Sequence, residues 1–330
     1  MKKENKDIMK AVVIYEPGGP EQFVVEERPV PDVRPGWSLV RVRGFGVNHS
    51  EIFTRKGQSP SVRFPRVLGI ECVGVVVETT DPVRLPEGQP VLSIMGEMGR
   101  DFDGGYEEYV LLPNEQIYPV ETDLPLPTLA ALPETFYTAY GSLKQLRMDD
   151  PEVESVLVRA ATSGVGVAFA RLMKGAYPEL RLVGSCRNLE KEEKLKEAGF
   201  DAVILDRDNT LQTNESFDRV LELVGPASLR DTFSHVRENG IVCVTGLLGG
   251  QWTLPDFDPL EDLPVNGYVT GFHSGNVTEE KLQEMLDFVA RFDVDAAPEK
   301  VFRFPNVAGA HAFLESGNSF GKTVVLIDEV

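Results

Sequence analysis

Residues 155–169 read SVLVRAATSGVGVAF: an apolar strand-like run, a turn of small residues, and a second apolar run that suits a helix. A dinucleotide-binding fold needs a tight strand-to-helix turn, with small residues where the backbone meets a pyrophosphate and where the helix packs on the strand. Ala161, Ser163 and Gly166 occupy the three positions of the G-x-G-x-x-G pattern, so only the last is glycine. An ordinary βα turn is the alternative interpretation. The residues predicted to meet the phosphates at the helix N-terminus are Ser163, Gly164, Val165 and Gly166.

The segments around this turn alternate between strands and helices. Apolar strands that alternate with amphipathic helices are typical of a parallel sheet covered on both faces. The expected strands are 155–160, 182–186, 202–205, 219–224, 241–245 and 268–271, and the expected helices are 126–146, 165–174 and 190–198. After them we expect a helix at 279–292, a strand at 301–304, a short helix at 307–315 and a strand at 323–328. The pattern predicts an α/β fold with a Rossmann doubly wound parallel sheet.

The end of the second strand bears on the choice of cofactor. An acidic residue at this point would hold the ribose hydroxyls of NAD, whereas arginine and small hydroxyl residues suit the 2′-phosphate of NADP. The sequence supplies Ser185 and Arg187, with Lys191 slightly further on, and no acid at the strand end. We therefore predict that these three residues bind NADP(H). The alternative is that Arg187 and Lys191 are a solvated pair at the start of a helix.

The first part of the chain has a different pattern, with short strands separated by glycine and proline. Several short strands with such turns indicate a compact β-barrel-like unit with few helices. The expected strands are 11–14, 23–27, 38–42, 73–78, 91–95 and 106–112.

Composition narrows the function classes. The chain has 330 residues, with 33 Lys+Arg against 52 Asp+Glu and a formal charge of −19, so a nucleic-acid partner is not expected. No apolar run is long enough to span a membrane, and three cysteines cannot form a disulfide framework or a zinc lobe built on clustered cysteines. Residues 1–8 are polar and mixed in charge, which favours an unstructured leader over a signal peptide. We expect a cytoplasmic protein with no membrane partner.

Short motifs along residues 9–330 give the chain a resemblance to the medium-chain dehydrogenase/reductase superfamily, and within it to the zinc-independent quinone oxidoreductases. They occur in the order typical of that family. The motifs are Ala11-Val12-Val13-Ile14, Gly18-Gly19-Pro20, Gly46-Val47-Asn48, Pro65-Arg66-Val67-Leu68-Gly69-Ile70-Glu71, Gly104-Gly105-Tyr106-Glu107-Glu108-Tyr109-Val110, Ala130-Ala131-Leu132-Pro133, Thr138-Ala139-Tyr140, Ser163-Gly164-Val165-Gly166 and Gly321-Lys322-Thr323-Val324-Val325-Leu326.

The resemblance implies a Rossmann domain inserted in a GroES-like β-barrel catalytic domain made from both ends of the chain. The expected divisions are 1–124 for the first part of the catalytic domain, 125–273 for the NADP-binding domain and 274–330 for the rest of the catalytic domain. The resemblance also implies a cofactor cleft where the two domains meet, and a homodimer.

Zinc members of the superfamily hold catalytic zinc with Cys, His and Cys, sometimes joined by a Glu. The matching positions here are Asn48, Ile70 and Glu134, and only Glu71 is kept. Isoleucine cannot ligate a metal, and zinc needs about three nitrogen, sulfur or oxygen donors from the protein. No metal site is therefore predicted. Cys72 is expected to be a core thiol on the face of the strand opposite Glu71.

The resemblance places the chemistry near Asn48, whose counterpart in the quinone reductases lies by the nicotinamide or the substrate. A tyrosine often proposed as a proton donor is replaced by Phe53, which makes the pocket more apolar. Asn48 and Phe53 are the candidate active-site residues. His49 and Ser50 have two interpretations, as contacts to cofactor or substrate or as ordinary polar residues.

Further cofactor contacts follow from the resemblance. Thr138 is expected near the nicotinamide ribose, and residues after two sheet strands are expected near the nicotinamide because ligands bind at the carboxyl ends of parallel strands. Asp206 stands where a relative has tyrosine at the adenosine site, and its carboxylate would sit awkwardly beside a 2′-phosphate. The remaining candidates are Thr245, Gly246, Leu247 and Phe272.

The predicted function is an NADPH-dependent, zinc-independent reduction of quinones or α,β-unsaturated carbonyl compounds by direct hydride transfer. A conjugated acceptor spreads the developing negative charge to a distal oxygen, so it needs no metal. Two alternatives remain open: a zinc-free enoyl reductase for a thioester or polyketide substrate, and a non-catalytic NADPH-binding sensor.

Overall fold

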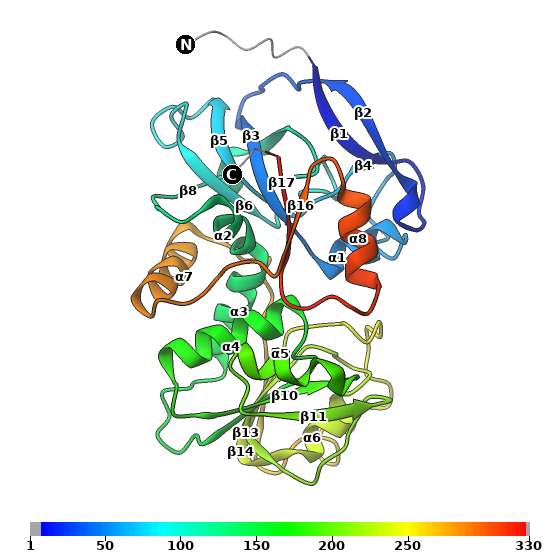
Figure 1. Ribbon diagram of the computed structural model, residues 1–330, viewed down its shortest axis with the longest axis vertical. Helices are drawn as coiled ribbons and strands as arrows, with labels where there is room; N and C mark the ends of the chain where they lie inside the picture. The colour runs from blue at the N-terminus through cyan, green and yellow to red at the C-terminus, as the bar shows by residue number, and fades with distance from the viewer. Residues whose placement is uncertain (1–7, 328–330) are drawn as a thin grey trace. The chain divides into compact units, whose positions relative to one another are not determined.

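The computed structural model describes residues 8–327, so the leader expected at the N-terminus lies, up to residue 7, outside the described residues. The described chain forms two compact units (Figure 1). Unit 2 comprises Phe136–Ser274 and Met285–Asp295; unit 1 comprises the residues before Phe136, Gly275–Glu284 and the residues from Ala296 onward. Each unit is described by itself.

Unit 2 is built on one sheet whose strands have the order β12-β11-β10-β9-β13-β14-β15. All neighbours are parallel except β12, which pairs antiparallel with β11 at one edge. Numbered along the chain, the six parallel strands lie in the order 3-2-1-4-5-6, so the predicted doubly wound Rossmann sheet is confirmed. The strands are β9 (Ser155–Val158), β10 (Arg181–Cys186), β11 (Ala202–Arg207), β12 (Thr210–Leu211), β13 (Phe217–Glu222), β14 (Val236–Val244) and β15 (Tyr268–Gly271).

Two of the helices predicted between residues 126 and 198 differ in the structure, and the first of them begins in unit 1. The single helix expected over 126–146 is two helices, α2 (Leu126–Ala131) and α3 (Pro133–Gln145), because Pro133 begins a new helix. The helix expected over 190–198 starts as the 3₁₀ turn η3 (Leu189–Lys191) and continues as α5 (Glu192–Glu197). Helix α4 (Gly164–Ala176) is confirmed, and the short α6 (Leu229–Ser234) was not predicted.

The core on one side of this sheet joins side chains from six strands, β9 to β14, and from α6. Its members include Leu157, Val183, Phe217, Val220, Phe233 and Val242, each less than one-tenth exposed. Because most strands of the sheet are covered on both faces, their residues form continuous apolar runs. This is the pattern from which the sequence predicts a parallel sheet.

Unit 1 consists of a three-stranded sheet, β2-β1-β4, and a larger sheet along β16-β17-β3-β5-β6-β8, with β7 also paired to β3. Its strands are β1 (Ile8–Ile14), β2 (Phe23–Pro29), β3 (Trp37–Val47), β4 (Arg66–Val67), β5 (Glu71–Glu78), β6 (Pro90–Ile94), β7 (Tyr109–Pro113), β8 (Tyr118–Pro119), β16 (Lys300–Arg303) and β17 (Thr323–Leu326). Strand β17 pairs antiparallel with β3, so segments from both ends of the described chain share one sheet.

The helical elements of unit 1 are few. Helix α1 (His49–Arg55) was not predicted, whereas α8 (Val307–Glu315) was. Helix α7 (Glu279–Arg291) was also predicted, and the division between the two units falls inside it. The two 3₁₀ turns are η1 (Pro20–Gln22) and η2 (Asn114–Gln116).

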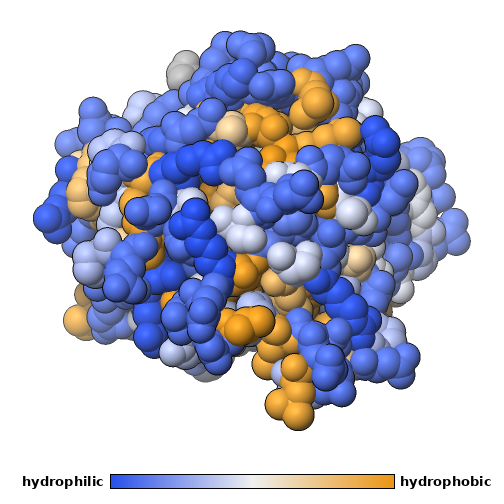
Figure 2. All heavy atoms as spheres, turned by 90° about the horizontal axis from the view of Figure 1, so that it is seen from below, coloured by the Kyte–Doolittle hydropathy of each residue, from blue (hydrophilic) through white to orange (hydrophobic). Residues whose placement is uncertain are grey.

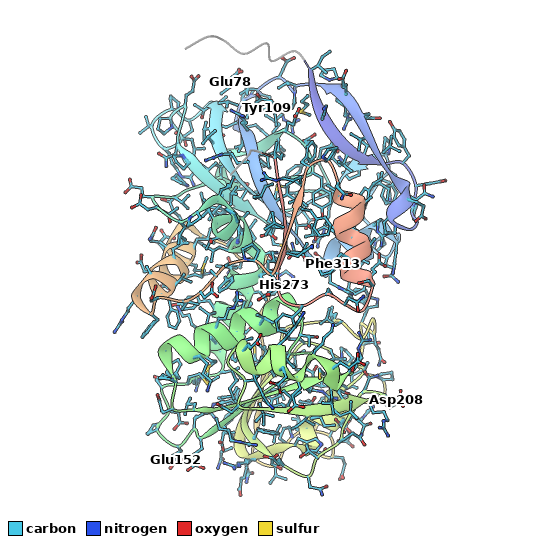
Figure 3. The ribbon with its side chains drawn as sticks, viewed as in Figure 1. Glu78, Tyr109, Glu152, Asp208, His273 and Phe313 are labelled. Atoms are coloured by element: carbon cyan, nitrogen blue, oxygen red, sulfur yellow. The ribbon has the colours of Figure 1, made fainter. Side chains whose placement is uncertain are left out.

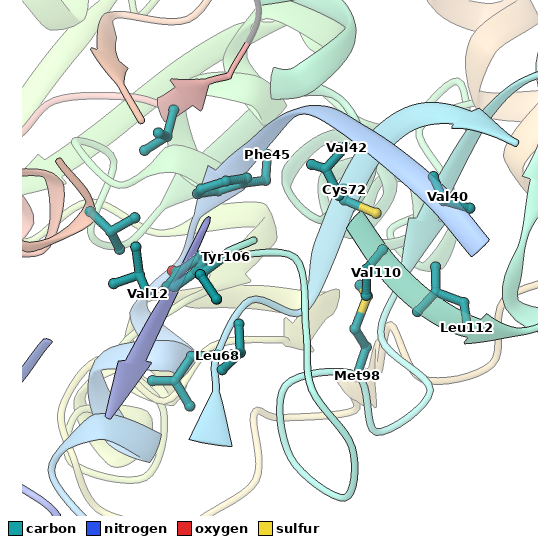
Figure 4. Packing of buried hydrophobic residues seen from close by; sticks show 14 of the residues in the cluster. Val12, Val40, Val42, Phe45, Leu68, Cys72, Met98, Tyr106, Val110 and Leu112 are labelled. Atoms are coloured by element: carbon teal, nitrogen blue, oxygen red, sulfur yellow. The ribbon is translucent and has the colours of Figure 1, made fainter. Parts of the chain in front are cut away.

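The core of unit 1 fills the space between its two sheets (Figure 4). The Phe45 and Tyr106 rings pack with centroids 4.8 Å apart, and Val12 and Leu68 lie beside them. Cys72 is 1% exposed in this core, which confirms the prediction of a core thiol.

No helix within residues 8–327 has the length and hydrophobicity needed to span a membrane.

Candidate functional site

The turn after β9 has the geometry that a dinucleotide requires. The Ser163 Oγ accepts a hydrogen bond from the Gly166 N–H at 3.1 Å and so caps α4. An added β-carbon on Gly166 would lie 2.6 Å from the Ala161 carbonyl oxygen, so only glycine lets the helix pack this closely on the turn. The last of the three pattern positions is therefore the one with the strictest steric requirement.

The first turn of α4 leaves backbone donors for a ligand. The first N–H groups of a helix have no partner within the helix, and here the side chain of Ser163 satisfies only that of Gly166. The N–H groups of Gly164 and Val165 stay available at the positive end of the helix dipole, which suits a pyrophosphate. The residues of this turn therefore fit a nicotinamide dinucleotide.

The three residues predicted to read the 2′-phosphate have unequal surroundings. The Ser185 hydroxyl is buried and accepts from the Ala160 N–H at 3.3 Å, so its observed contact fixes the turn. Arg187 is exposed, and the structure gives it no hydrogen bond or ion pair within residues 8–327. Lys191 is partly exposed, and its pKa is lowered, first by partial burial and then by the Arg187 and Lys194 charges. Arg187 is the more accessible of the two cations.

A buried arginine that was not predicted as a site residue lies next to this turn. Arg159 is 0% exposed, and its guanidinium contacts Asp206 at 2.7 Å and Asp231 at 2.8 Å. Asp206, predicted to crowd a 2′-phosphate, is thus 6% exposed and ion-paired inside the unit. Burial deprives the arginine side chain of hydration and of rotamer freedom, and two carboxylates offset this cost here.

The end of β13 is joined to the loop after β14 by a buried carboxylate residue. The Glu222 carboxylate accepts from the N–H groups of Val224 at 2.7 Å and Gly225 at 3.0 Å, and its backbone carbonyl accepts from Thr245 and Gly246. Burial raises the pKa of Glu222, and the nearby Arg159 charge lowers it. Thr245, Gly246 and Leu247 therefore lie at the carboxyl edge of the sheet, as predicted for nicotinamide contacts.

Other residues of unit 2 that are predicted to bind the cofactor lie on helix α3 or contact it. The Ser142 Oγ donates to the Thr138 carbonyl at 2.8 Å and lies 2.9 Å from the Thr245 Oγ1. The Phe272 ring packs edge-on against Tyr137, with centroids 5.8 Å apart. Figure 3 labels His273, the residue after Phe272, beyond the end of β15. The structure thus brings Thr138, Thr245 and Phe272 around one helix.

In unit 1, Asn48 precedes α1 and is held by two charged side chains. Its Nδ2 donates to Glu71 Oε1 at 2.7 Å, and its Oδ1 accepts from the Lys322 ammonium at 2.8 Å. The ammonium also contacts Glu71 Oε1 at 2.6 Å, and both charged residues are at most 5% exposed. One amide N–H of Asn48 remains for a substrate or cofactor atom.

A second buried carboxylate supports the same loop. Glu51 accepts from the Asn48 N–H at 2.8 Å and from the Ile70 N–H at 3.1 Å. Burial, and then the charge of Glu71, raise the pKa of Glu51 to about 7. This residue fixes the backbone on both sides of the candidate active site.

Phe53 and His49 lie one turn apart on α1, with ring centroids 5.3 Å apart in an edge-to-face arrangement. Ser50 is on the same helix, and its buried Oγ has no hydrogen-bond partner within residues 8–327. Helix α1 thus carries an aromatic ring without a hydroxyl at the position where the resemblance implies a tyrosine.

The donor set at the positions that match zinc ligands does not suit zinc. Ile70 contributes no donor atom, and the Glu134 backbone N–H donates to Glu71 Oε2 at 2.7 Å. The side-chain oxygens Asn48 Oδ1 and Glu71 Oε1 are already bound to the Lys322 ammonium. A zinc ion in this place would have to displace the Lys322 ammonium.

Three residues of these sites were not predicted: Lys322, Glu51 and Arg159. Lys322 was part of a family motif, but its partner Glu71 is 251 residues away, and no spacing rule connects them. Glu51 had a local signal, since Asn48 followed three residues later by an acid is typical of a helix start. The local signal for Arg159 was its position directly after an apolar strand.

Two family models match the chain. The one described as "Alcohol dehydrogenase GroES-like domain" matches residues 34–122, and the one described as "Zinc-binding dehydrogenase" matches residues 198–325. The first match, together with the sheets of unit 1, confirms the predicted GroES-like fold.

Several of the relatives with assigned names are quinone oxidoreductases. YhfP of Bacillus subtilis, named provisionally as a quinone oxidoreductase, is 33% identical over 221 residues, which are 64% of this chain and 66% of that protein. This chain thus spans about two thirds of the length of YhfP in that alignment. The human quinone oxidoreductase is 25% identical over 287 residues, with 84% of each chain covered.

Solved structures agree with the fold along the whole chain. The structure of Bacillus subtilis yhfP with NAD bound has a TM-score of 0.82 and 25% identity, covering 97% of this chain and 99% of the other. The yhdH oxidoreductase from Salmonella enterica in complex with NADP has a TM-score of 0.81 at 18% identity, covering 97% of this chain and 100% of the other. Proteins with this fold have thus been solved with either dinucleotide.

Proposed function

The chain belongs to the medium-chain dehydrogenase/reductase superfamily, among its quinone-oxidoreductase-like NAD(P)-dependent enzymes, and we propose that it is an NADPH-dependent, zinc-independent reductase of quinones or α,β-unsaturated carbonyl compounds. The observation that carries the proposal is the Lys322 ammonium bound to Asn48 and Glu71, where a zinc enzyme would place its metal. A site of this kind favours acceptors that take a hydride without a metal to polarise them.

The residues of the chain would have separate tasks in this reaction. A bound nicotinamide supplies the hydride. The turn of α4 binds the pyrophosphate, Asn48 directs its remaining amide N–H to a reacting atom, and Phe53 provides an apolar wall. Because Lys322 and Glu71 hold the Asn48 amide from both ends, its orientation is fixed before substrate binds.

The overall test is the loss of NADPH absorbance with a panel of quinones, enones and enoyl thioesters. We expect turnover with quinones or enones and little with thioesters. Turnover confined to thioesters would favour the enoyl reductase alternative. Tight NADPH binding without turnover of any acceptor would favour the sensor and contradict the proposed activity.

For the cofactor we propose NADP(H), recognised through Arg187 with Lys191 beside it. Replacement of Arg187 by aspartate is expected to weaken NADPH binding about tenfold to a hundredfold, because hydrogen bonds to charged groups contribute about 1.5–3 kcal/mol. NADH binding should change less than about threefold, since NADH lacks the 2′-phosphate. Dissociation constants from fluorescence titration measure both effects.

The control is Arg181→Asp, which changes the net charge equally but lies at the other end of β10 and pairs with Glu215 at 2.8 Å. It should leave the ratio of NADPH to NADH affinity unchanged. Equal losses of both cofactors in Arg187→Asp would show that Arg187 does not read the phosphate.

We further propose that the protein is a homodimer joined through the β15 edge of unit 2. Strand β15 is the last strand of its sheet, and Tyr268 and Val269 on it are 61% and 42% exposed. Other exposed apolar side chains occur nearby in the sequence, at Trp252, Phe257, Leu260 and Val265. Figure 2 shows one face of the molecule on which hydrophobic side chains reach the surface between hydrophilic ones. An uncovered edge strand with apolar side chains favours pairing with a second copy.

Tyr268→Lys is expected to convert the dimer into a monomer of 36.5 kDa, because a charged side chain on an edge strand opposes pairing. Light scattering coupled to size-exclusion chromatography measures the mass. The control is Val301→Lys, which changes an apolar residue that is 41% exposed on β16, an edge strand of unit 1. A wild-type monomer, or a dimer that persists in Tyr268→Lys, would contradict the β15 interface. The cytoplasmic location stays a prediction.

A further inference from the structure

The register of the Rossmann sheet places a carboxylate residue next to the arginine proposed to bind the 2′-phosphate. Strands β10 and β11 are parallel, and Cys186 pairs with Leu205. Arg187 is the residue that follows β10, and Asp206 is the residue after Leu205 in β11. An ion pair between them would be the ordinary outcome, and it would compete directly with a phosphate for the guanidinium.

The structure shows a different pairing. Asp206 is 6% exposed, and its Oδ2 accepts hydrogen bonds from Arg159 Nη2 at 2.7 Å and Nε at 3.1 Å. Arg159 directly follows β9, on the other side of β10 in the sheet. Figure 3 labels Asp208, two residues beyond Asp206, where the chain leaves β11.

The rest of the Arg159 guanidinium is also occupied. Its Nη1 donates to Asp231 Oδ2 at 2.8 Å, to Thr232 Oγ1 at 2.9 Å and to the Ser228 carbonyl at 3.2 Å. Because Arg159 is 0% exposed, it cannot itself reach a cofactor phosphate. Its effect on a ligand must pass through the carboxylate that it holds.

Because Asp206 is paired with Arg159, the charge of Arg187 stays exposed. It has no carboxylate partner among residues 8–327, although Asp206 lies one residue beyond the last paired position of β10 and β11. The next acid along the chain, Glu190, accepts from Asn188 Nδ2 at 2.8 Å. The charge of Lys191 is near enough to that of Arg187 to lower the Lys191 pKa. Arg187 thus faces solvent, and the Asp206 carboxylate is turned inward.

We propose that Arg159 is a positioning residue for cofactor selectivity: by holding Asp206 inside the unit, it keeps Arg187 available for the 2′-phosphate of NADP(H). The inference rests on the proposed NADP(H) preference and adds the residue on which that preference depends. Without Arg159, the released Asp206 carboxylate would either neutralise the Arg187 guanidinium or repel the phosphate.

The experiment compares dissociation constants of the full-length protein for four probes: NADPH, NADH, 2′,5′-ADP and 5′-AMP. Arg159→Met is expected to weaken NADPH and 2′,5′-ADP about tenfold or more, with less than about threefold change for NADH and 5′-AMP. The double variant Arg159→Met/Asp206→Asn should recover the preference, because it removes the released carboxylate. If Arg159 only stabilised the fold, the removal of a second residue would not be expected to restore selectivity.

The matched control is Asp231→Asn, which also breaks an Arg159 ion pair but lies on α6. It should leave the ratio of NADPH to NADH affinity unchanged. Asp206→Asn keeps Arg159 in place and tests the proposal even where Arg159→Met does not fold. Its affinity ratio should stay within about twofold of wild type, because the carboxylate that it removes does not face the phosphate.

The outcomes separate the inference from the proposed function. A wild-type protein that binds 2′,5′-ADP no better than 5′-AMP would overturn the NADP(H) preference itself. A wild type with that preference, in which Arg159→Met weakens all four probes equally, would overturn only the role of Arg159. A large gain in NADPH preference in Asp206→Asn would also overturn it, since Asp206 would then already act on the phosphate.

Discussion

Replacement of Lys322 by methionine is expected to lower the free energy of unfolding of unit 1 by about 3–5 kcal/mol, the usual cost of removing one partner from a buried ion pair. Glu71 is 0% exposed, and its Oε1 contacts the Lys322 ammonium at 2.6 Å. Methionine has a similar volume but no charge, so the carboxylate would stay buried with only the Asn48 amide and the Glu134 N–H as partners.

The two tryptophans allow the effect to be assigned to one unit. Trp37 lies in unit 1 and Trp252 in unit 2, so a Trp252→Phe background makes tryptophan fluorescence report the urea unfolding of unit 1 alone. The control in the same background is Lys10→Met, an exposed lysine of unit 1, with an expected cost within about 0.5 kcal/mol.

A compensating variant tests the cause of the loss. Glu71→Gln combined with Lys322→Met removes both charges and should recover most of the stability, because no unpaired charge stays buried. If Lys322→Met costs no more than Lys10→Met, the ion pair does not stabilise the candidate active site.

Gly166→Val is expected to weaken dinucleotide binding at least about a hundredfold, equal to about 2.7 kcal/mol. The added β-carbon would lie 2.6 Å from the Ala161 carbonyl oxygen, which is backbone and cannot rotate away. Helix α4 would have to move off the turn, and its free N–H groups would no longer point at one pyrophosphate. Isothermal titration with NADPH and with NADH measures the loss, which should be equal for the two cofactors.

Val165→Ala is the matched control, since it changes the neighbouring side chain while its N–H stays in the first turn of α4. Its affinity for either cofactor should stay within about threefold of wild type. Circular dichroism distinguishes lost binding from lost folding. Wild-type affinity in Gly166→Val would mean that the dinucleotide does not bind at this turn.

Much of the fold followed from local patterns, because the covered strands of unit 2 carry an almost unbroken apolar signal. Strand β15 and helix α8 have the predicted bounds, and α4 starts one residue earlier and ends two residues later than predicted. Helix α1 was missed because seven residues that include Phe53 and Thr54 have no strong helical periodicity. The start of α1 depends on the capping interaction between Asn48 and Glu51. In the sequence, the only trace of this interaction is an acid three residues after an asparagine.

The site was harder to predict than the fold, because its decisive interactions are long-range. Sequence motifs located Asn48, Thr245 and the α4 turn, yet gave no information on which charges are paired. From its position alone, Asp206 would be an obstacle to a 2′-phosphate, whereas Arg159, 47 residues earlier, holds it inside the unit. The direction of a carboxylate depends on tertiary packing, which neither composition nor spacing describes.

The pairing of β17 with β3 has a consequence for the order of events during synthesis. Unit 2 is almost contiguous in sequence, so the ribosome releases the main part of it before β17 exists. The larger sheet of unit 1 must wait with β3 uncovered on one side until the whole Rossmann segment has been made. Lys322 immediately precedes β17, and therefore the active-site ion pair is among the last native interactions that a nascent chain can form.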